Sequence, residues 1–274
     1  MFSENLKWHF PASIEKAVQL IKQPGVILHA GGTRILKTQS RSINGLVDVG
    51  KLKLNYLKRK NNLVHIGSAV TFGEVVKFCK RNNCLPMLGA ALSEAASTPL
   101  RNRITIGGSI KDFPLWSNLF APLIALDAKL EIHDGKTKII SIEDYINGGM
   151  IKTKHLIKEV IAQEDENIIW RVKRFSVLKF EYPLFNIAAV FKMNGDLILQ
   201  ARLIITGVKT RYKRFSKAEN IFEGKIISGN LVKQVMKFIE PKFISDYQYS
   251  ARYKERAAKI CFEDILIEMT GVSR

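Results

Sequence analysis

Two glycine pairs in this sequence stand where backbone N–H groups could bind an anion. Gly31-Gly32 follows the short apolar run Val26–Ala30, and Gly107-Gly108 lies near the end of the segment Arg101–Ser109. We expect each pair to form a turn after an extended strand, because glycine lacks a Cβ and lets N–H groups approach a ligand closely. Two such turns brought together would form a cradle for a pyrophosphate. Neither pair matches Gly-x-Gly-x-x-Gly or the P-loop, and for each pair alone an ordinary tight turn is the alternative interpretation.

The cysteines and histidines show no pattern of a metal site or a disulfide framework. The three cysteines are an odd number without a Cys-x-x-Cys pair, whereas an iron–sulfur cluster needs four thiolates and a structural zinc four ligands. The five histidines have no metal-ligand spacing. Cys79 follows Phe72, Val75 and Val76 on one helical face, so we expect it to pack in the core. No paired carboxylates or triad stand out, so we expect neither catalytic side chains nor a metal in this chain.

The composition indicates a folded protein without a membrane span. Hydrophobic residues make up 46% of the 274 positions, which is too apolar for a disordered chain. No window approaches 18 consecutive apolar residues, so a transmembrane helix is not expected. The first residues lack a basic segment followed by an apolar one. We therefore expect a cytoplasmic protein.

The chain is strongly basic, with 43 Lys+Arg against 25 Asp+Glu and a net charge of +18. Such a balance raises the hypothesis of nucleic-acid binding. However, the basic residues are spread along the chain in short clusters, and none of the nucleic-acid motif spacings is present. We expect no nucleic acid, and favour a basic face for acidic partner subunits or a contribution to solubility.

Capping and turn residues predict the order of the elements. Ser13 caps a first helix, Thr71-x-x-Glu74 is a capping box, and Asp134-Gly135 and Asn194-Gly195 predict hairpins. Helices are expected over 14–21, 72–79, 87–97, 218–222, 231–239 and 246–269, the last ended by Gly271, and strands over 26–30, 46–49, 63–66, 130–132, 138–140, 185–193 and 197–206. A mixed α/β pattern thus gives way near residue 170 to an antiparallel sheet with C-terminal helices.

These motifs resemble a known family. The segment Ala30–Leu36 resembles the "AGGTDLL" loop of the FAD-binding subunit of molybdenum hydroxylases, the group of carbon monoxide dehydrogenase, xanthine dehydrogenase and aldehyde oxidase. Arg101–Ser109 resembles the second signature of that subunit, "IRNVATIGGN/S". The segment "APLIALDAKLEI" resembles the strand after the second loop, and "SDYQYSARYKERAAKICFEDIL" resembles the closing helix. The resemblance covers essentially the whole chain.

The resemblance implies an α+β fold in two domains. The first, 1–170, would be an FAD-binding domain of the PCMH (vanillyl-alcohol-oxidase-like) type, with α/β subdomains of about 1–52 and 53–170. The second, 171–274, would be a C-terminal domain of the carbon monoxide dehydrogenase flavoprotein type, with an antiparallel sheet and helices. The segments 28–35 and 105–109 would hold the FAD pyrophosphate and the neighbouring ribityl and ribose groups.

The site residues implied by the resemblance come from five places in the chain. Lys173 aligns with a family lysine near the flavin, and Ile157 falls near an apolar position at the isoalloxazine. The implied cofactor-binding residues are Leu28, His29, Ala30, Gly31, Gly32, Thr33, Arg34, Ile35, Thr105, Ile106, Gly107, Gly108, Ser109, Asn118, Ile157 and Lys173.

The sequence departs from the family pattern in three places. Asn118 replaces a common FAD-contacting aspartate, and its amide can still form hydrogen bonds. Arg34 stands where Asp, Ser or His is usual and would add positive charge beside a pyrophosphate. The segment Phe175–Tyr182 lacks the arginine-rich "GRRRAFD" run.

The resemblance implies an electron-transfer flavoprotein subunit. Electrons would arrive from 2Fe–2S centres of a small partner subunit, which receives them from a large molybdopterin subunit. They would leave through FAD to NAD, a quinone or oxygen. Two alternatives stay open: a stand-alone flavin reductase of the same fold, and a binding or assembly module without FAD. Hetero-oligomeric assembly follows from the first hypothesis alone.

Overall fold

The computed structural model describes residues 6–35, 40–179 and 181–271. The chain forms two compact units, each assembled from separate stretches of sequence. The first unit contains Met1–Leu85, Ser97–Phe113 and Asp127–Glu164, and the second contains Pro86–Ala96, Pro114–Leu126 and Asp165–Arg274. The boundary near residue 170 stays a prediction, but the sequence did not reveal that two earlier segments pack with the C-terminal part.

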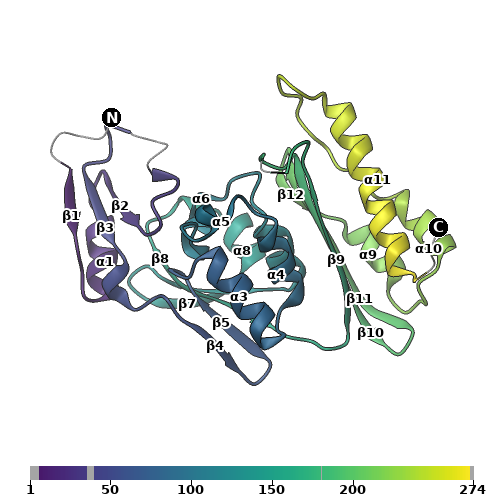
Figure 1. The fold of residues 1–274 in the computed structure, drawn as a ribbon, viewed down its shortest axis with the longest axis horizontal. Coiled ribbons are helices and arrows are strands. Elements are labelled where there is room, and N and C mark those ends of the chain that lie inside the picture. Colours follow the sequence, from purple (N-terminus) through teal and green to yellow (C-terminus); the bar gives the residue numbers. More distant parts are fainter. Residues whose placement is uncertain (1–5, 36–39, 180, 272–274) are drawn as a thin grey trace. The chain divides into compact units, whose positions relative to one another are not determined.

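The first unit begins with a parallel sheet in the order β1-β3-β2 (Figure 1). Its elements are β1 (Lys7–His9), α1 (Ile14–Ile21), β2 (Val26–His29) and β3 (Gly45–Asp48). Ser13 caps α1 as predicted, because its Oγ accepts a hydrogen bond from the Lys16 N–H at 3.2 Å. Ala17, Val18 and Ile21 of α1 pack against the sheet and bury its apolar side chains. The helix and two of the three strands were predicted, and β1 was missed because it spans three residues.

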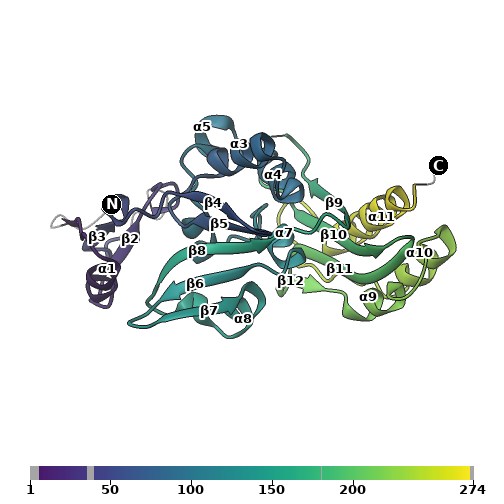
Figure 2. The ribbon, with the colours of Figure 1, turned by 90° about the horizontal axis from the view of Figure 1, so that it is seen from below.

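A five-stranded antiparallel sheet forms the centre of the first unit, with the strand order β4-β5-β8-β6-β7 (Figure 2). Its strands are β4 (Leu57–Lys60), β5 (Leu63–Gly67), β6 (Lys129–His133), β7 (Thr137–Ser141) and β8 (Leu156–Gln163). The predicted hairpin at Asp134-Gly135 joins β6 to β7, and Gly135 has a φ of +121°, which only glycine adopts readily.

Short helices accompany this sheet. They are α3 (Phe72–Asn82), α5 (Thr98–Arg101), α6 (Ile106–Asp112) and α8 (Ile142–Asn147), with the 3-10 turns η1 (Gly50–Leu52) and η2 (Met150–Lys152). The predicted capping box opens α3: the Thr71 side chain accepts from the Glu74 N–H at 3.2 Å, and the Glu74 carboxylate accepts from the Thr71 N–H at 2.7 Å. Cys79 is buried on the inner face of α3, which confirms its packing role.

The second glycine pair does not form a turn after a strand, and this prediction was wrong. Gly107 and Gly108 lie in the first turn of α6, which begins after Thr105. Two glycines in a seven-residue helix hide its periodicity, because glycine has poor helix propensity. The helix forms because the Thr105 hydroxyl accepts from the Gly108 N–H at 3.3 Å and because Gly107 packs against Ser68.

The second unit is built on an antiparallel sheet with the order β12-β11-β10-β9. The strands are β9 (Ile168–Phe175), β10 (Phe185–Asn194), β11 (Leu197–Val208) and β12 (Arg211–Arg214). The predicted hairpin at Asn194-Gly195 joins β10 to β11, and Gly195 has a φ of +57°. The two-residue connection between β10 and β11 is the one that the sequence predicted.

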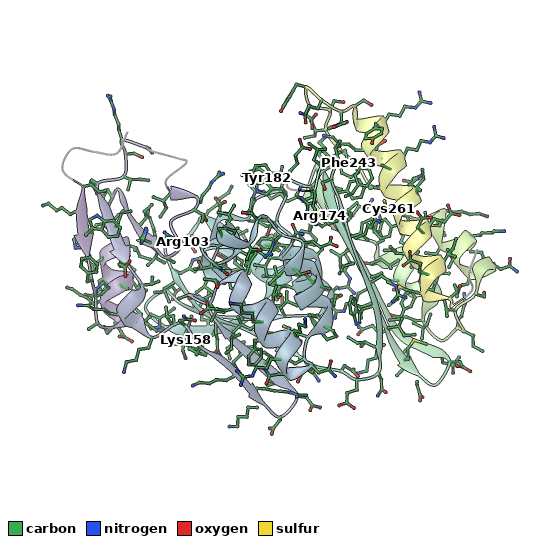
Figure 3. The ribbon with its side chains drawn as sticks, viewed as in Figure 1. Arg103, Lys158, Arg174, Tyr182, Phe243 and Cys261 are labelled. Carbon is green, nitrogen blue, oxygen red and sulfur yellow. The ribbon has the colours of Figure 1, made fainter. Side chains whose placement is uncertain are left out.

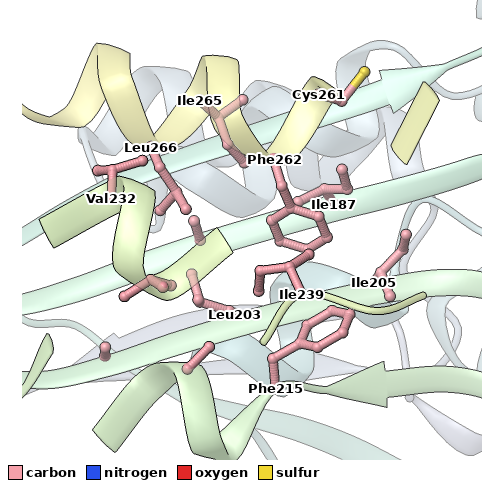
Figure 4. Close-up of a cluster of buried hydrophobic side chains, with 14 of the residues drawn as sticks. Ile187, Leu203, Ile205, Phe215, Val232, Ile239, Cys261, Phe262, Ile265 and Leu266 are labelled. Carbon is pink, nitrogen blue, oxygen red and sulfur yellow. The ribbon is translucent and has the colours of Figure 1, made fainter. Parts of the chain in front are cut away.

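Helices cover both faces of this sheet: α9, α10 and α11 on one face, α4 and α7 on the other (Figure 1). They are α4 (Pro86–Ser93), α7 (Phe120–Ala125), α9 (Ser216–Phe222), α10 (Gly229–Met236) and α11 (Ala251–Met269). Figure 4 shows the core between the sheet and α9–α11, where Phe262 of α11 meets Phe215 and Ile187. Among the described residues no helix combines the length and apolarity needed to cross a bilayer.

Three predicted boundaries differ from the structure. The last helix begins at Ala251 because Ser250 caps it, rather than at residue 246. The helix expected over 87–97 ends at Ser93. Residues 121–125, expected to lead into a strand, belong to α7, because a short apolar run bounded by turns fits a buried helix as well as a strand.

Candidate functional site

The two glycine-containing segments of the first unit lie against each other. A Cβ built on Gly31 would stand 1.6 Å from the Arg103 carbonyl oxygen, so the two backbones are in direct contact. The Arg103 guanidinium reinforces this contact, because its Nε and Nη2 lie 3.3 and 3.1 Å from the Gly31 carbonyl oxygen. Figure 3 labels Arg103, which lies between the three-stranded sheet and the helices α5 and α6. Any larger residue at Gly31 would push the segments apart.

The turn after β2 presents unpaired backbone donors. Within the described ranges, the N–H groups of Gly31, Gly32 and Thr33 donate to no acceptor. Gly32 has a φ of +73°, in the left-handed region that glycine adopts readily. Unpaired N–H groups are rare in proteins, and successive backbone N–H groups in a turn can bind anions.

The first turn of α6 lies beside this turn, and its own N–H groups are already paired: those of Gly108 and Ser109 donate to the Thr105 hydroxyl and carbonyl oxygens at 3.3 and 2.9 Å. Thr105 is the N-cap, and Ile106 and Gly107 are buried, with their N–H groups bound to Val70 and Ser68 carbonyls at 2.9 and 2.8 Å. Gly108 is exposed, and the only neighbour that its Cβ would meet within 4 Å is the Thr105 hydroxyl. Ser109 is buried in the next position.

Positive groups surround the Gly31–Gly32 turn. Besides Arg103, the Arg34 guanidinium lies here, with its Nε 3.0 Å from Asp112 of α6, so its charge is partly balanced. His29, the last residue of β2, pairs through Nδ1 with Asp48 at 3.1 Å. The field at the turn is therefore suited to an anionic ligand.

The other implied residues of the first unit mainly contact the hydrophobic core or neighbouring strands. Leu28 and Ala30 are half-buried against the core below α1. Ile35 is the last described residue of the loop, and Leu36 of the motif lies outside the described residues. Ile157 is buried in β8, where it pairs with Ile132 of β6 across a bulge.

Two implied residues, Asn118 and Lys173, belong to the second unit. The Asn118 amide is buried and donates to the Ala91 carbonyl oxygen of α4 at 3.2 Å, which is a structural contact. Lys173 is exposed on β9 opposite Ile187, on the face that α11 covers, and its charge acts on the Cys261 thiol. Phe180, in the loop that departs from the family pattern, lies outside the described residues.

The described part of the chain contains no group of three His, Cys, Asp or Glu residues that could hold a metal ion. The three cysteines are free and buried. Burial, with the nearby Cys84 thiol, raises the pKa of Cys79 to about 12, so this thiol is inert at neutral pH. Sequence reasoning missed the roles of Arg103, Asp48 and Asp112, although Arg103 stands inside the second signature.

Comparison with known proteins identifies the family. Residues 3–162 match the family described as the FAD binding domain in molybdopterin dehydrogenase. The chain belongs to this family. Residues 173–269 of this flavoprotein subunit match the CO dehydrogenase flavoprotein C-terminal domain. Membership confirms the resemblance seen in the two signatures, and makes the chain an oxidoreductase subunit whose cofactor is FAD.

Individual relatives agree with this assignment. The nicotine 6-hydroxylase medium subunit of Paenarthrobacter nicotinovorans is 24% identical over 96% of each chain. The xanthine dehydrogenase FAD-binding subunit of Escherichia coli O157:H7 is 30% identical over 54% of this chain and 53% of its own length.

Solved structures share the fold. Chains of quinoline 2-oxidoreductase from Pseudomonas putida 86 and of a carbon monoxide dehydrogenase from Hydrogenophaga pseudoflava each align with a TM-score of 0.87 at 20% identity. The first alignment covers 99% of both chains and the second 96% of both. The predicted fold, an FAD-binding domain followed by an antiparallel sheet with C-terminal helices, is confirmed.

The residues of the first unit fit a dinucleotide cofactor. A pyrophosphate needs closely approaching N–H donors and a positive field, and the Gly31–Thr33 turn and Arg103 supply these. A side chain at Gly32 would have to adopt a φ of +73° and would meet the His29 ring at 3.0 Å. The geometry therefore requires glycine where the resemblance places the phosphates.

Proposed function

We propose that this flavoprotein subunit transfers electrons within a multi-subunit molybdenum hydroxylase. A small subunit with 2Fe–2S centres would deliver them, after a large molybdopterin subunit has oxidised the substrate. NAD, a quinone or oxygen would accept them. When bound, FAD supplies the electron exchange, and the protein supplies binding and orientation. One observation carries the proposal: among the described residues the N–H groups of Gly31, Gly32 and Thr33 have no acceptor, and their turn packs against the loop that precedes α6.

The residues of this chain would hold the cofactor rather than transform a substrate. Gly31–Thr33 would donate to the pyrophosphate beside the first turn of α6, with Arg103 stabilising both the loop and the negative charge. Ile157 of the first unit would contact FAD as the resemblance implies. No described cluster of side chains offers a metal site, so the iron–sulfur and molybdenum centres would belong to partners.

Two further parts of the proposal concern location and domains. Three free, buried thiols among the described residues favour a reducing compartment, which supports a cytoplasmic location. The two family matches end at residue 162 and begin at residue 173, which supports a domain boundary near residue 170.

The test begins with the chain purified alone and titrated with FAD. Stoichiometric binding, seen as a bound-flavin spectrum, is expected, and an absence of binding would refute the proposal in favour of an assembly module. The FAD-loaded chain is then mixed with NADH under anaerobic conditions, where flavin reduction would identify NAD as the acceptor.

Assembly is tested by co-expression with a large molybdopterin-binding subunit and a small 2Fe–2S subunit of the same family. We expect the three to copurify, and substrate-dependent flavin reduction to require both partners. Turnover of a small substrate by the FAD-loaded chain alone would instead favour the stand-alone reductase.

A further inference from the structure

His29 and Asp48 form a side-chain pair at the edge of the cofactor turn that the resemblance does not account for. They are the last residues of the parallel strands β2 and β3 and lie in register with each other. The carboxyl ends of both strands meet here, beside the Gly31–Gly32 turn. The His29 Nδ1 is 3.1 Å from the Asp48 Oδ2, and the two side chains are 18% and 26% exposed. Solvent therefore reaches the pair, but most of it is enclosed.

The contacts of this pair fix the orientation of the imidazole. The second carboxylate oxygen of Asp48 accepts from the Gly50 N–H at 2.8 Å, so the carboxylate cannot turn away. The Trp8 ring packs edge-on against the imidazole, with 4.8 Å between centroids and 75° between planes. Because a carboxylate accepts hydrogen bonds, Asp48 holds the proton of His29 on Nδ1.

The free nitrogen of His29 faces the turn. A Cβ built on Gly32 would lie 3.0 Å from the His29 Nε2, and 3.9 Å from an Arg103 nitrogen. Among the described residues Nε2 has no hydrogen-bond partner. In the neutral imidazole Nε2 is a bare acceptor, whereas in the imidazolium it is a donor beside Gly32 of the turn.

From this geometry we propose that protonated His29, held by Asp48, donates its Nε2–H to a phosphate oxygen of the cofactor, so that FAD binds more tightly as pH falls. The inference rests on the proposed FAD site at the Gly31–Gly32 turn. Binding of the diphosphate and of a proton to His29 are then linked, because each stabilises the other. Asp48 is a positioning residue that holds the imidazole through Nδ1.

Other charges near the imidazole do not change sign in the same pH range. Arginine stays protonated, and the paired carboxylate of Asp112 is tied to Arg34. The charged groups that face His29 or lie just beyond its neighbours are Asp48, Arg103, Arg34 with Asp112, and Lys51, whose ammonium lies over the Phe10 ring stacked on Trp8. A pH dependence of FAD affinity between pH 5.5 and 8, where imidazoles titrate, would thus report His29.

The experiment measures the Kd of FAD by flavin fluorescence at several pH values from 5.5 to 8 at constant ionic strength. The wild-type chain should bind about tenfold more weakly at the high end, the loss expected for one charge-assisted hydrogen bond. The variant His29→Gln should show a flat profile near the wild-type value at pH 8. His65→Gln is the matched control, because His65 also pairs through Nδ1 with a carboxylate, Glu159, at 2.9 Å. This control should keep the wild-type profile.

A second variant protects the test against misfolding. Asp48→Asn keeps a side chain of the same shape, and should move the midpoint of the FAD-affinity profile to lower pH, because an amide stabilises the imidazolium less than a carboxylate does. An unchanged wild-type slope in His29→Gln, or an unshifted midpoint in Asp48→Asn, would overturn the inference. A wild-type chain that binds FAD equally well throughout the range would overturn it too, whereas one that binds no FAD at any pH would refute the proposed function itself.

Discussion

Substitution of Gly108 by alanine should separate cofactor binding from folding. Gly108 is the third residue of α6 and is exposed, and its added Cβ would meet only the Thr105 hydroxyl, at 2.7 Å. That hydroxyl can rotate by a small amount. Gly32 is a poorer probe, because a side chain there must adopt a φ of +73°. A Gly32→Val variant would be strained whether or not FAD binds.

The expected magnitudes can be estimated from the helix. Alanine is more favourable than glycine in a helix by about 0.5 to 1 kcal/mol, and weakening the Thr105 cap costs about 1 kcal/mol. The two effects nearly cancel, so the free energy of unfolding should change by less than about 1 kcal/mol. If a phosphate rests on the first turn of α6, the methyl group occupies its contact surface, and FAD affinity should fall about tenfold to a hundredfold, or roughly 1.4 to 2.8 kcal/mol.

The assay pairs FAD titration by fluorescence with thermal unfolding of the FAD-free protein. Gly229→Ala is the control, because Gly229 also lies in the first turn of a helix, α10, and its added Cβ would meet no described residue outside its own helix turn within 4 Å. The control should bind FAD like the wild type. A Gly108→Ala variant with wild-type affinity would show that the start of α6 does not contact the cofactor.

Three more predictions follow from single contacts. Gly31→Ala should lower both the melting temperature and FAD affinity, since its Cβ would lie 1.6 Å from the Arg103 carbonyl oxygen; an unchanged melting curve would contradict that packing. Burial lowers the pKa of His155 from 6.5 to about 4, so the folded state binds this proton less readily than the unfolded state does. The free energy of unfolding should therefore fall by up to about 3 kcal/mol as pH drops from about 6.5 to 4. Denaturant melts of wild type and His155→Gln at both pH values check this, and an equal loss in the variant would point to other groups. Elemental analysis of the chain purified alone should give negligible iron, because three cysteines cannot supply four thiolates; stoichiometric iron and sulfide would show that this chain holds a cluster of its own.

The sequence alone determined the helix caps and hairpin turns, because these depend on interactions between residues close together in the chain. The caps at Ser13 and at Thr71 with Glu74, and the hairpins at Asp134-Gly135 and Asn194-Gly195, formed where predicted. Each depends on hydrogen bonds and φ angles within a few residues, so neighbouring residue types are sufficient to specify it. The two glycine signatures also identified the family, which the match of residues 3–162 confirmed.

Tertiary structure decided what lies around those signatures. Gly31 meets Arg103 across 72 positions, and His29 meets Asp48 across 19, and no local pattern encodes either contact. The second glycine pair became a helix start because packing on Ser68 outweighed poor helix propensity. Lys173 lies on the face of β9 that α11 covers. Alternation along a strand tells which residues share a face, but only the packed sheet decides which face meets the helix. Contacts between distant segments depend on the whole chain's packing, and therefore only the folded structure reveals the polar surroundings of the cofactor turn.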